Sequence, residues 1–489
     1  MMNEDGSVNT AKIYIDGNWI HDPQTHQIGE SINPATGLVE AFYVAANKGD
    51  VDHAVTSARK AFDTSAWSQT PKIRSEVLRK FADRLEVRSP EISAMLVALN
   101  GKLKREADGE IAASVSELRY YSGLARNLFG RTLEIEPDKF SAIEREAIGV
   151  AAIIVPWNAP VTLLIRSLAP ALAAGCTTVI KTAFQTALVH EMVMKCLVDD
   201  VDLPKGVVNW FTESGSNASE LLCVHPEVDV ISFTGSTAVG KKIAESTSHR
   251  LTRLSLELGG KAPAIVLPDA NLDRSIKGVV SGACVMAGQM CTAISRVLVH
   301  VSKKDEVTDR LVKALKSVRV GPGRDATSEM GALIDTRSQQ RLLGLIDEAK
   351  QKCTVHLAGS IPEGLAEGSS FLTPSVVEVD DLSSKFVQNE LFGPIVTLET
   401  FSDTDEALHK ANATRYGLAS SIWTDDYRLA GYMARRLKFG NVWINAHNRL
   451  FAEVETGGYR ESGIGRLHGV DGLADFMETK HVYTDRSQH

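Results

Sequence analysis

Apolar and polar positions follow one another along this chain with two different periods. Between residues 51 and 129 apolar side chains recur every three or four positions, which predicts amphipathic helices over 51–67, 73–88 and 92–129. Short apolar runs rich in β-branched residues follow, separated by helical segments, at 149–156, 176–181, 206–211, 228–235 and 262–267. Such runs predict buried parallel strands in a doubly wound α/β sheet, an architecture typical of nucleotide-binding proteins.

A second block with alternating strands and helices begins near residue 280. Its predicted strands lie near 297–302, 393–400, 419–423 and 441–445. We therefore expect two α/β domains with a cleft between them, which is where functional sites usually lie. The closing segment KHVYTDR (480–486) predicts an exposed strand that needs a partner, such as the sheet edge of another subunit.

Length and charge limit the class of protein. A chain of 489 residues is too long for one compact core and predicts two or three domains. The net charge of −8, with both signs mixed along the chain, argues against nucleic-acid binding, and the basic run 316–324 is interpreted as a solvated helix end. Without a long apolar stretch or an apolar leader we expect no membrane span and a cytoplasmic location.

The cysteine and histidine content predicts neither disulfides nor a metal site. Six cysteines are spread over the whole chain without a CxxC pair. His190 begins HEMVMK, which lacks the second histidine of the zinc-binding HExxH motif. We therefore expect no bound metal ion.

The run FTGSTAVGKK (233–242) follows a predicted strand and opens a helix, so its backbone amides could hold a phosphate. Its glycine spacing matches the P-loop of ATPases, which predicts magnesium-dependent ATP hydrolysis. However, Lys242 stands where a P-loop needs the Ser or Thr that binds magnesium, and a GxGxxG fingerprint is also missing. By itself the run fits an ordinary strand-to-helix turn equally well.

The stretch GQMCTA (288–293) contains the cysteine with the most chemical interest, Cys291. A free cysteine is more often a small buried apolar side chain than a nucleophile. Four further motifs change this interpretation, and with GQMC (288–291) they stand in the order PWNAP (156–160), FTGSTAVG (233–240), LELGGK (256–261), GQMC and ELFGP (390–394). Glu257 and Cys291 are 34 residues apart.

Together these motifs resemble the aldehyde dehydrogenase superfamily. The resemblance extends from IDGNW (15–19) to ESGIGRLHG (461–469), almost the whole chain. It implies two doubly wound α/β domains, for cofactor binding and for catalysis, and a small β element for oligomerisation as a homodimer or homotetramer. The implied ranges are 1–124 and 148–257 for the cofactor-binding domain, 258–459 for the catalytic domain, and 125–147 with 470–489 for the oligomerisation element.

The implied activity is the oxidation of a small-molecule aldehyde to a carboxylic acid with NAD or NADP. Cys291 would attack the aldehyde as a thiolate, after its proton passes to Glu257 directly or through water. The side-chain amide of Asn158 and the backbone N–H of Cys291 would stabilise the thiohemiacetal oxygen. Hydride transfer would leave a thioester on Cys291, and Glu257 would activate the water that hydrolyses it.

The resemblance also implies a set of cofactor-binding residues: Trp157, Lys181, Phe184, Gly235, Ser236, Leu258, Glu390 and Phe392. Lys181 would bind the adenine-side ribose, Glu390 the hydroxyls of the nicotinamide ribose, and Phe392 would pack near the nicotinamide. Relatives often have a glutamate at the position of Phe184, and its carboxylate repels the 2′-phosphate of NADP. Its absence predicts that NADP competes with NAD, unless Phe184 simply packs beside the adenine.

On the substrate side the chain departs from the common family pattern. Ala159 stands where phenylalanine is usual, and Glu455 and Thr456 replace proline and phenylalanine, which predicts a wider tunnel. Arg166, just over two helical turns after Asn158, could receive a carboxylate or a polar ring substituent, or form a structural salt bridge. PWNAP with this arginine resembles bacterial enzymes for aromatic aldehydes or semialdehydes from aromatic and N-heterocyclic breakdown, the 3-succinoylsemialdehyde-pyridine dehydrogenases among them.

Two alternatives within the family remain. CoA-acylating semialdehyde dehydrogenases share the thioester step but generally lack the glutamate of ELGG, so Glu257 favours hydrolysis. Non-catalytic members, such as lens proteins, share the scaffold, and the presence of Cys291, Glu257 and Asn158 together argues against that assignment.

Overall fold

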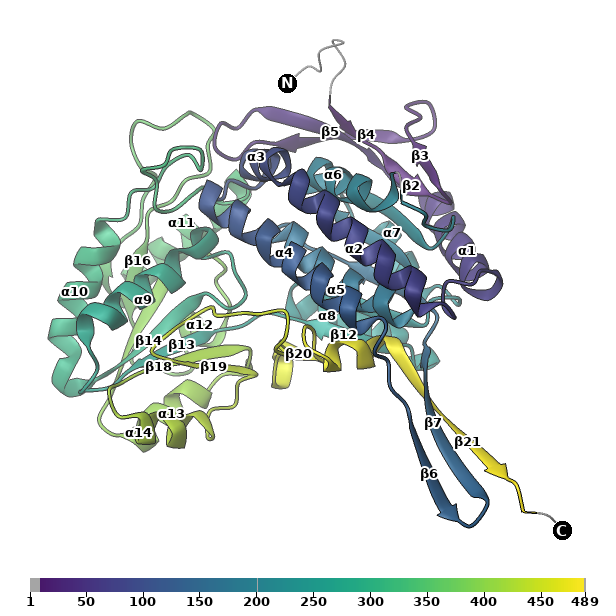
Figure 1. Cartoon of the computed structure of the whole chain (residues 1–489). Coiled ribbons are helices and arrows are strands. Elements are labelled where there is room, and N and C mark those ends of the chain that lie inside the picture. The colour runs from purple at the N-terminus through teal and green to yellow at the C-terminus, as the bar shows by residue number, and fades with distance from the viewer. Residues whose placement is uncertain (1–8, 200, 488–489) are drawn as a thin grey trace.

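The computed structural model describes residues 9–199 and 201–487. Figure 1 shows two α/β lobes side by side and a β arm that projects away from them. Three sheets, of 11, 7 and 3 strands, underlie these parts. The predicted mixed α/β fold, with parallel sheets flanked by helices, is confirmed.

The larger sheet belongs to the lobe that contains the N-terminal half of the chain. Its main strand order is β1-β5-β10-β9-β8-β11-β12-β20. Its strands are β1 (Thr10–Ala11), β2 (Ile13–Ile15), β3 (Asn18–Ile20), β4 (Gln27–Ile32), β5 (Val39–Ala45), β8 (Val150–Ile154), β9 (Thr177–Ala183), β10 (Val208–Glu213), β11 (Val230–Thr234), β12 (Arg253–Glu257) and β20 (Gly463–Ile464). The first four predicted apolar runs form β8 to β11, which pair in parallel and are almost fully buried.

Helices cover both faces of this sheet. They are α1 (Lys48–Thr64), α2 (Pro71–Val87), α3 (Ser89–Asn100), α4 (Lys104–Leu124), α5 (Pro160–Ala174), α6 (Ala187–Val198), α7 (Asn217–Val224) and α8 (Thr237–Thr247). The segment predicted as one helix over 92–129 is two helices, because Gly101 adopts a left-handed conformation with φ of 79° and ends α3. This break brings the start of α4 to the active site described below.

The smaller sheet has the order β15-β16-β17-β14-β13-β18-β19 and lies in the other lobe. Its strands are β13 (Ala262–Val266), β14 (Ile294–His300), β15 (Thr354–Leu357), β16 (Ser375–Glu378), β17 (Ile395–Phe401), β18 (Ala419–Trp423) and β19 (Asn441–Ile444). Its helices are α9 (Leu272–Cys284), α10 (Lys304–Lys316), α11 (Thr336–Lys352), α12 (Lys385–Gln388), α13 (Thr404–Asn412) and α14 (Tyr427–Ala434).

The apolar pattern alone groups one strand with the wrong sheet. By this pattern the run 262–267 belongs with the four runs before it, whereas the domain ranges implied by the resemblance separate it from them, and β13 pairs with β14 and β18 in the smaller sheet. The chain crosses between the sheets over the short segment that joins Glu257 to Ala262. An apolar run predicts a buried strand equally well in either sheet, so its pattern could not decide between them.

The third sheet forms the arm, with β21 (Met477–Asp485), β7 (Lys139–Ala147) and β6 (Arg131–Glu136) in that order. The predicted exposed strand at the C-terminus is β21, and its partner is β7 of the same chain. Apart from Met477, the side chains of β21 are exposed. No helix in the two described ranges is long and apolar enough to cross a lipid bilayer.

Candidate active site

Cys291, Glu257 and Asn158 lie in the wall of one cavity of about 490 Å³. Glu257 is the last residue of β12, Asn158 lies just before α5, and Cys291 follows the short helical turn after α9. Residues far apart in the sequence therefore converge where strand ends of the larger sheet face a loop of the other lobe. The structure thus brings together all three residues expected to carry the chemistry.

Cys291 is partly exposed, whereas Cys176, Cys196, Cys223 and Cys284 are buried. Burial of the sulfur raises the pKa of the Cys291 thiol to about 11, while Arg166 acts in the opposite direction. No acceptor in the described residues engages the backbone N–H of Cys291. Cys291 therefore lines the cavity with a backbone N–H that has no acceptor among the described residues, which favours a nucleophile over a packing residue.

The loop before Cys291 has an unusual backbone. Met286, Ala287 and Gly288 all have positive φ, at 48°, 54° and 71°. A Cβ on Gly288 would lie 2.4 Å from the carbonyl carbon of Gly393, so the GQMC loop and the FGP segment touch backbone to backbone. Two of the sequence motifs are therefore in direct contact, and the contact fixes the position of the thiol.

Glu257 has the environment of a buried base. It is 5% exposed, and its Oε1 has no hydrogen-bond partner among the described residues. Burial raises the pKa of the carboxyl group, and Arg166 is the strongest influence that lowers it. A carboxyl group with a raised pKa binds a proton more readily than an ordinary glutamate, which suits a general base.

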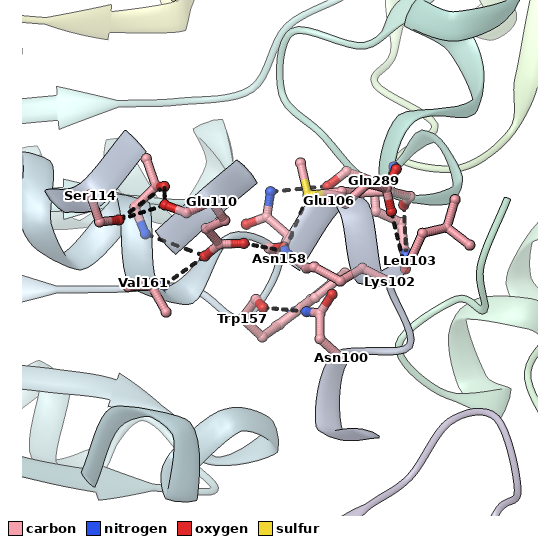
Figure 2. A network of polar contacts seen from close by, with 12 residues as sticks. Asn100, Lys102, Leu103, Glu106, Glu110, Ser114, Trp157, Asn158, Val161 and Gln289 are labelled. Atoms are coloured by element: carbon pink, nitrogen blue, oxygen red, sulfur yellow. Dashed lines mark hydrogen bonds and ion pairs between the residues drawn. The ribbon is translucent and has the colours of Figure 1, made fainter. Parts of the chain in front are cut away.

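Asn158 is held in place by a buried network that the sequence analysis did not identify (Figure 2). The side-chain Nδ2 of Asn158 donates to the backbone carbonyl of Gln289 at 2.9 Å, and the backbone carbonyl of Asn158 accepts from Nζ of Lys102 at 2.9 Å. A side-chain amide has two N–H donors, so one remains for a ligand. The amide therefore reaches the cavity from a fixed position, as an oxyanion donor should.

The same network extends to α4. Nζ of Lys102 forms a fully buried ion pair with Glu110, whose other oxygen accepts from the backbone N–H of Val161 at 2.7 Å. Asn100 donates to the carbonyl of Trp157 at 2.7 Å. The segment before α5 is therefore held on both sides of Asn158 by residues that precede or begin α4.

Glu106 connects this network to the loop of the nucleophile. Its carboxylate accepts from the N–H of Leu103 at 2.9 Å and from the N–H of Met286 at 2.8 Å. The sequence contains no signal for the contact between Glu106 and Met286, because the two residues are 180 positions apart and carry no recurrent spacing.

The two residues expected on the substrate side also line the cavity. Ala159 is buried beside Asn158. Arg166 is 7% exposed, donates from Nη2 to Oγ1 of Thr234 at 3.0 Å, and lies 4.0 Å from the carboxylate of Glu257. The rest of the wall is largely apolar and includes Leu163, Val285, Met286, Met290, Leu450 and Phe451.

A second cavity of about 1,320 Å³ lies at the carboxyl ends of β8, β9 and β10. Lys181 lines it, together with Ile154, Phe233 and the N-terminal part of α7. Its size and its place in a doubly wound sheet fit the adenosine half of a dinucleotide. Lys242 of the GKK segment also lines this cavity, and Lys241 pairs with Glu461 at 2.8 Å.

Four more of the predicted cofactor residues lie near the junction of the two lobes. The rings of Trp157 and Phe392 meet edge to face, with centroids 5.7 Å apart. Glu390 accepts from the N–H of Gly260 at 3.2 Å, and its burial raises its pKa to about 7. Leu258 packs so closely on α8 that a Cβ on Gly240 would lie 2.5 Å from it.

Of the last three predicted cofactor residues, Gly235 and Ser236 lie at the start of α8, whereas Phe184 lies elsewhere. The backbone N–H of Gly235 donates to the carbonyl of Glu257 at 3.0 Å, and Ser236 caps the N-terminus of α8. Phe184 does not line the large cavity. Its ring packs on Tyr43, with centroids 5.6 Å apart.

Among the described residues, no group of three His, Cys, Asp or Glu side chains could hold a metal ion.

Comparisons with known proteins agree with this geometry. The model of the aldehyde dehydrogenase family matches residues 19–482. The betaine aldehyde dehydrogenase of Bacillus subtilis (strain 168) is 35% identical over 479 residues, with 96% of each chain covered. Aldehyde dehydrogenase family 2 member C4 of Arabidopsis thaliana is 34% identical over 476 residues, with 96% of this chain and 94% of that protein covered.

A solved structure provides a further likeness. The betaine aldehyde dehydrogenase of Staphylococcus aureus, in complex with NAD+, superposes with a TM-score of 0.94 at 34% identity. The superposition covers 98% of this chain and 96% of that one.

Proposed function

Because this chain belongs to the aldehyde dehydrogenase family, we propose that it oxidises an aldehyde to a carboxylic acid with NAD or NADP through a covalent bond to Cys291. The observation that carries the proposal is the single cavity that joins Cys291, Glu257 and Asn158. Enzyme activity of the aldehyde dehydrogenase class follows from the family. The roles of these three residues are the proposal.

The first half of the reaction builds the bond between sulfur and substrate. Glu257 takes the thiol proton, directly or through water, and the Cys291 sulfur adds to the aldehyde carbon. The negative charge moves to the aldehyde oxygen, where the second N–H of the Asn158 amide and the free N–H of Cys291 stabilise it. A nicotinamide bound beside the thiohemiacetal accepts the hydride, which leaves a thioester on Cys291.

The second half releases the acid. Glu257, after it has passed the thiol proton on to water, removes a proton from a second water molecule that attacks the thioester carbon, and the sulfur leaves as the thiolate. The place of Glu257 in the wall of the cavity that contains Cys291 supports this role. It also favours hydrolysis over transfer of the acyl group to CoA.

The decisive experiment replaces the nucleophile. Cys291→Ala should abolish formation of acid and of NAD(P)H while cofactor binding, measured by fluorescence titration, stays nearly unchanged. Unchanged turnover in this variant would contradict the proposal. Acid formation that requires CoA in the wild-type enzyme would instead favour the CoA-acylating alternative.

We propose that the substrate is an aromatic aldehyde or a semialdehyde. The apolar wall formed by Leu163, Met290 and Phe451, with the small side chain of Ala159 next to Asn158, supports a flat or bulky apolar body. Two of the relatives are named for betaine aldehyde, which carries a quaternary ammonium group instead. A screen of aromatic, aliphatic and quaternary ammonium aldehydes, read by NAD(P)H absorbance, distinguishes these classes.

We further propose that NADP competes with NAD. Lys48, Lys181 and Lys242 line the adenosine cavity, and Phe184, which packs on Tyr43 outside it, adds no carboxylate to Glu213 and Glu220 of its wall. A preference for NAD above about a hundredfold in kcat/KM, or roughly 2.7 kcal/mol, would contradict this proposal.

Assembly as a homodimer or homotetramer is proposed through the arm. β21 lies at an edge of the three-stranded sheet, and its exposed side chains suit pairing with a second copy. Light scattering of the full chain and of a variant truncated before β21 tests this. A cytoplasmic location stays a prediction.

A further inference from the structure

Arg166 is a buried cation whose hydrogen-bonding capacity is largely unused. A guanidinium group has five N–H donors. Among the described residues it makes a single hydrogen bond, from Nη2 to Thr234, and its Nε is buried without a partner. A buried charge with so few partners is costly, so its position calls for a reason beyond packing.

The guanidinium lies at the reacting groups and not at the far end of the cavity. Nη2 is 4.0 Å from Oε2 of Glu257. Arg166 is also the first influence that lowers the pKa of the Cys291 thiol against the effect of burial. A substrate carboxylate bound to this guanidinium would come close to the Glu257 carboxylate, and the two like charges would repel each other.

Other charged groups surround these residues and act less strongly. The Glu257 carboxyl also senses His468, Arg466 and Asp475, and the Cys291 thiol senses Glu390 and Glu257. His468 itself is bonded to Glu117 of α4 at 2.8 Å. Of the cations, only Arg166 acts on both reacting groups.

We propose that Arg166 is a positioning residue for the reaction: its positive charge opposes the effect of burial on the Glu257 carboxyl and on the Cys291 thiol, which line the same cavity, and it does not receive an anionic end of the substrate. The proposal rests on the roles proposed above for Glu257 and Cys291. It assigns the salt-bridge contact of Arg166 an electrostatic task, because the single negative charge that Glu257 and Cys291 share before the attack needs a compensating positive charge in a buried site.

The first test measures the thiol without any aldehyde. The rate of Cys291 alkylation by iodoacetamide is followed against pH, with the modified peptide quantified by mass spectrometry so that other cysteines do not contribute. Arg166→Gln removes the charge but keeps an amide donor for Thr234, Arg166→Lys keeps a charge, and Arg449→Met removes an exposed cation near the cavity mouth as the matched control.

At a pH below the midpoint, alkylation in Arg166→Gln should be about tenfold slower or more, since an opposite charge at this range shifts a pKa by one unit or more. Arg166→Lys should recover most of the rate, and Arg449→Met should match the wild type. An alkylation profile of Arg166→Gln that coincides with the wild-type profile, in protein that still binds the cofactor, overturns the proposal.

The second test separates this role from substrate recognition. In Arg166→Gln, the acidic limb of kcat/KM should move to higher pH by the same amount for a neutral and for a carboxylate-bearing aldehyde. A loss confined to the carboxylate-bearing aldehyde, with an unchanged limb, overturns the proposal in favour of substrate binding. If no aldehyde is oxidised by the wild type, the proposed function fails, while the alkylation profiles still decide the role of Arg166.

Discussion

Two buried ion pairs at the same cavity differ in how well their atoms are satisfied, and three of their four residues, Glu110, Arg166 and Glu257, line it. Lys102 and Glu110 are in close contact, and Lys102 also donates to the backbone carbonyl of Asn158 while Glu110 accepts from the backbone N–H of Val161 in the first turn of α5. Arg166 and Glu257 are 4.0 Å apart, and each has a buried atom without a partner. Both pairs are almost completely removed from water.

The difference indicates that Lys102 and Glu110 support the structure of the site, whereas Arg166 and Glu257 take part in the reaction. A buried pair with all its hydrogen bonds made fixes the backbone around it, and its loss is a loss of stability. A loosely held pair keeps donors and acceptors free for a substrate or a water molecule, at a cost in stability. The cavity therefore combines a rigid wall that positions Asn158 with a reactive wall that contains Glu257.

The largest expected effect breaks the reactive pair. Glu257→Gln should lower the rate of acid release by about 10²–10⁴-fold, because a general base is lost while the shape is kept. Intact-mass spectrometry after mixing with aldehyde and cofactor should detect an acyl group on Cys291. Full turnover, or no acyl-enzyme at reduced turnover, would show that Glu257 does not act in deacylation.

Loss of the Lys102–Glu110 pair should lower the stability of the folded protein. Glu110→Gln leaves the Lys102 charge buried without a counter-charge and should lower the free energy of unfolding by about 3–5 kcal/mol, measured by urea denaturation. The double variant Lys102→Met with Glu110→Leu should recover part of this loss, because no unpaired charge remains. A double variant less stable than the single one would contradict the assignment as a satisfied pair.

Asn158 lies where the two walls meet and should affect activity more than stability. Asn158→Ala removes one oxyanion donor and should reduce kcat by about 10²–10³-fold, which corresponds to about 2.7–4 kcal/mol in the barrier. Steady-state kinetics gives the loss, and iodoacetamide alkylation of Cys291 serves as the control for an intact thiol. A change in KM alone would contradict the oxyanion role.

The pH dependence of stability sharpens the comparison further. Burial raises the pKa of Glu257 above its ordinary value of 4.5, so the folded protein binds this proton more tightly than the unfolded chain. Its contribution to stability is therefore present below pH 4.5 and is lost as the pH rises through the folded pKa. Glu257→Gln should lack this loss, so the difference in unfolding free energy between variant and wild type, measured by urea denaturation, should shift in favour of the variant as the pH rises from acid to neutral.

An exposed ion pair on α4 should give the smallest loss of stability. Lys104 and Asp108 in α4 form an ion pair in which both side chains are about half exposed. Lys104→Ala should cost less than about 1 kcal/mol, because water and salt screen an exposed pair. A thermal melt measures this, and a cost equal to that of Glu110→Gln would contradict the distinction by burial.

Much of the fold could be predicted because its signals are local. The buried parallel strands β8 to β11 stand out as apolar runs, and α1 and α2 as periodic segments. The strands between Thr10 and Ala45 were not predicted, since they are short and many of their positions are only partly buried. Membership of β13 in the smaller sheet also had no local signal, because pairing depends on partners elsewhere in the chain.

For the site, the residue types in the motifs were enough to select Cys291, Glu257 and Asn158. Their motifs carry unusual residues at fixed spacing, which a sequence can reveal. Lys102, Glu110 and Glu106 were missed, because a charged residue at a helix start is ordinarily solvated. Lys102 and Glu110 are buried, and Glu106 is partly buried, which the sequence does not show.

The sequence by itself therefore determined the α/β fold class, the family resemblance and the reacting groups. The tertiary structure decided which charged side chains are buried. It also decided which of them support the site and which lie beside the reacting groups. Arg166 illustrates the difference: its sequence position allowed a substrate contact or a salt bridge, and the structure places it 4.0 Å from Glu257. The reason is physical, since burial and distance set the strength of a charge and neither is a local property of the chain.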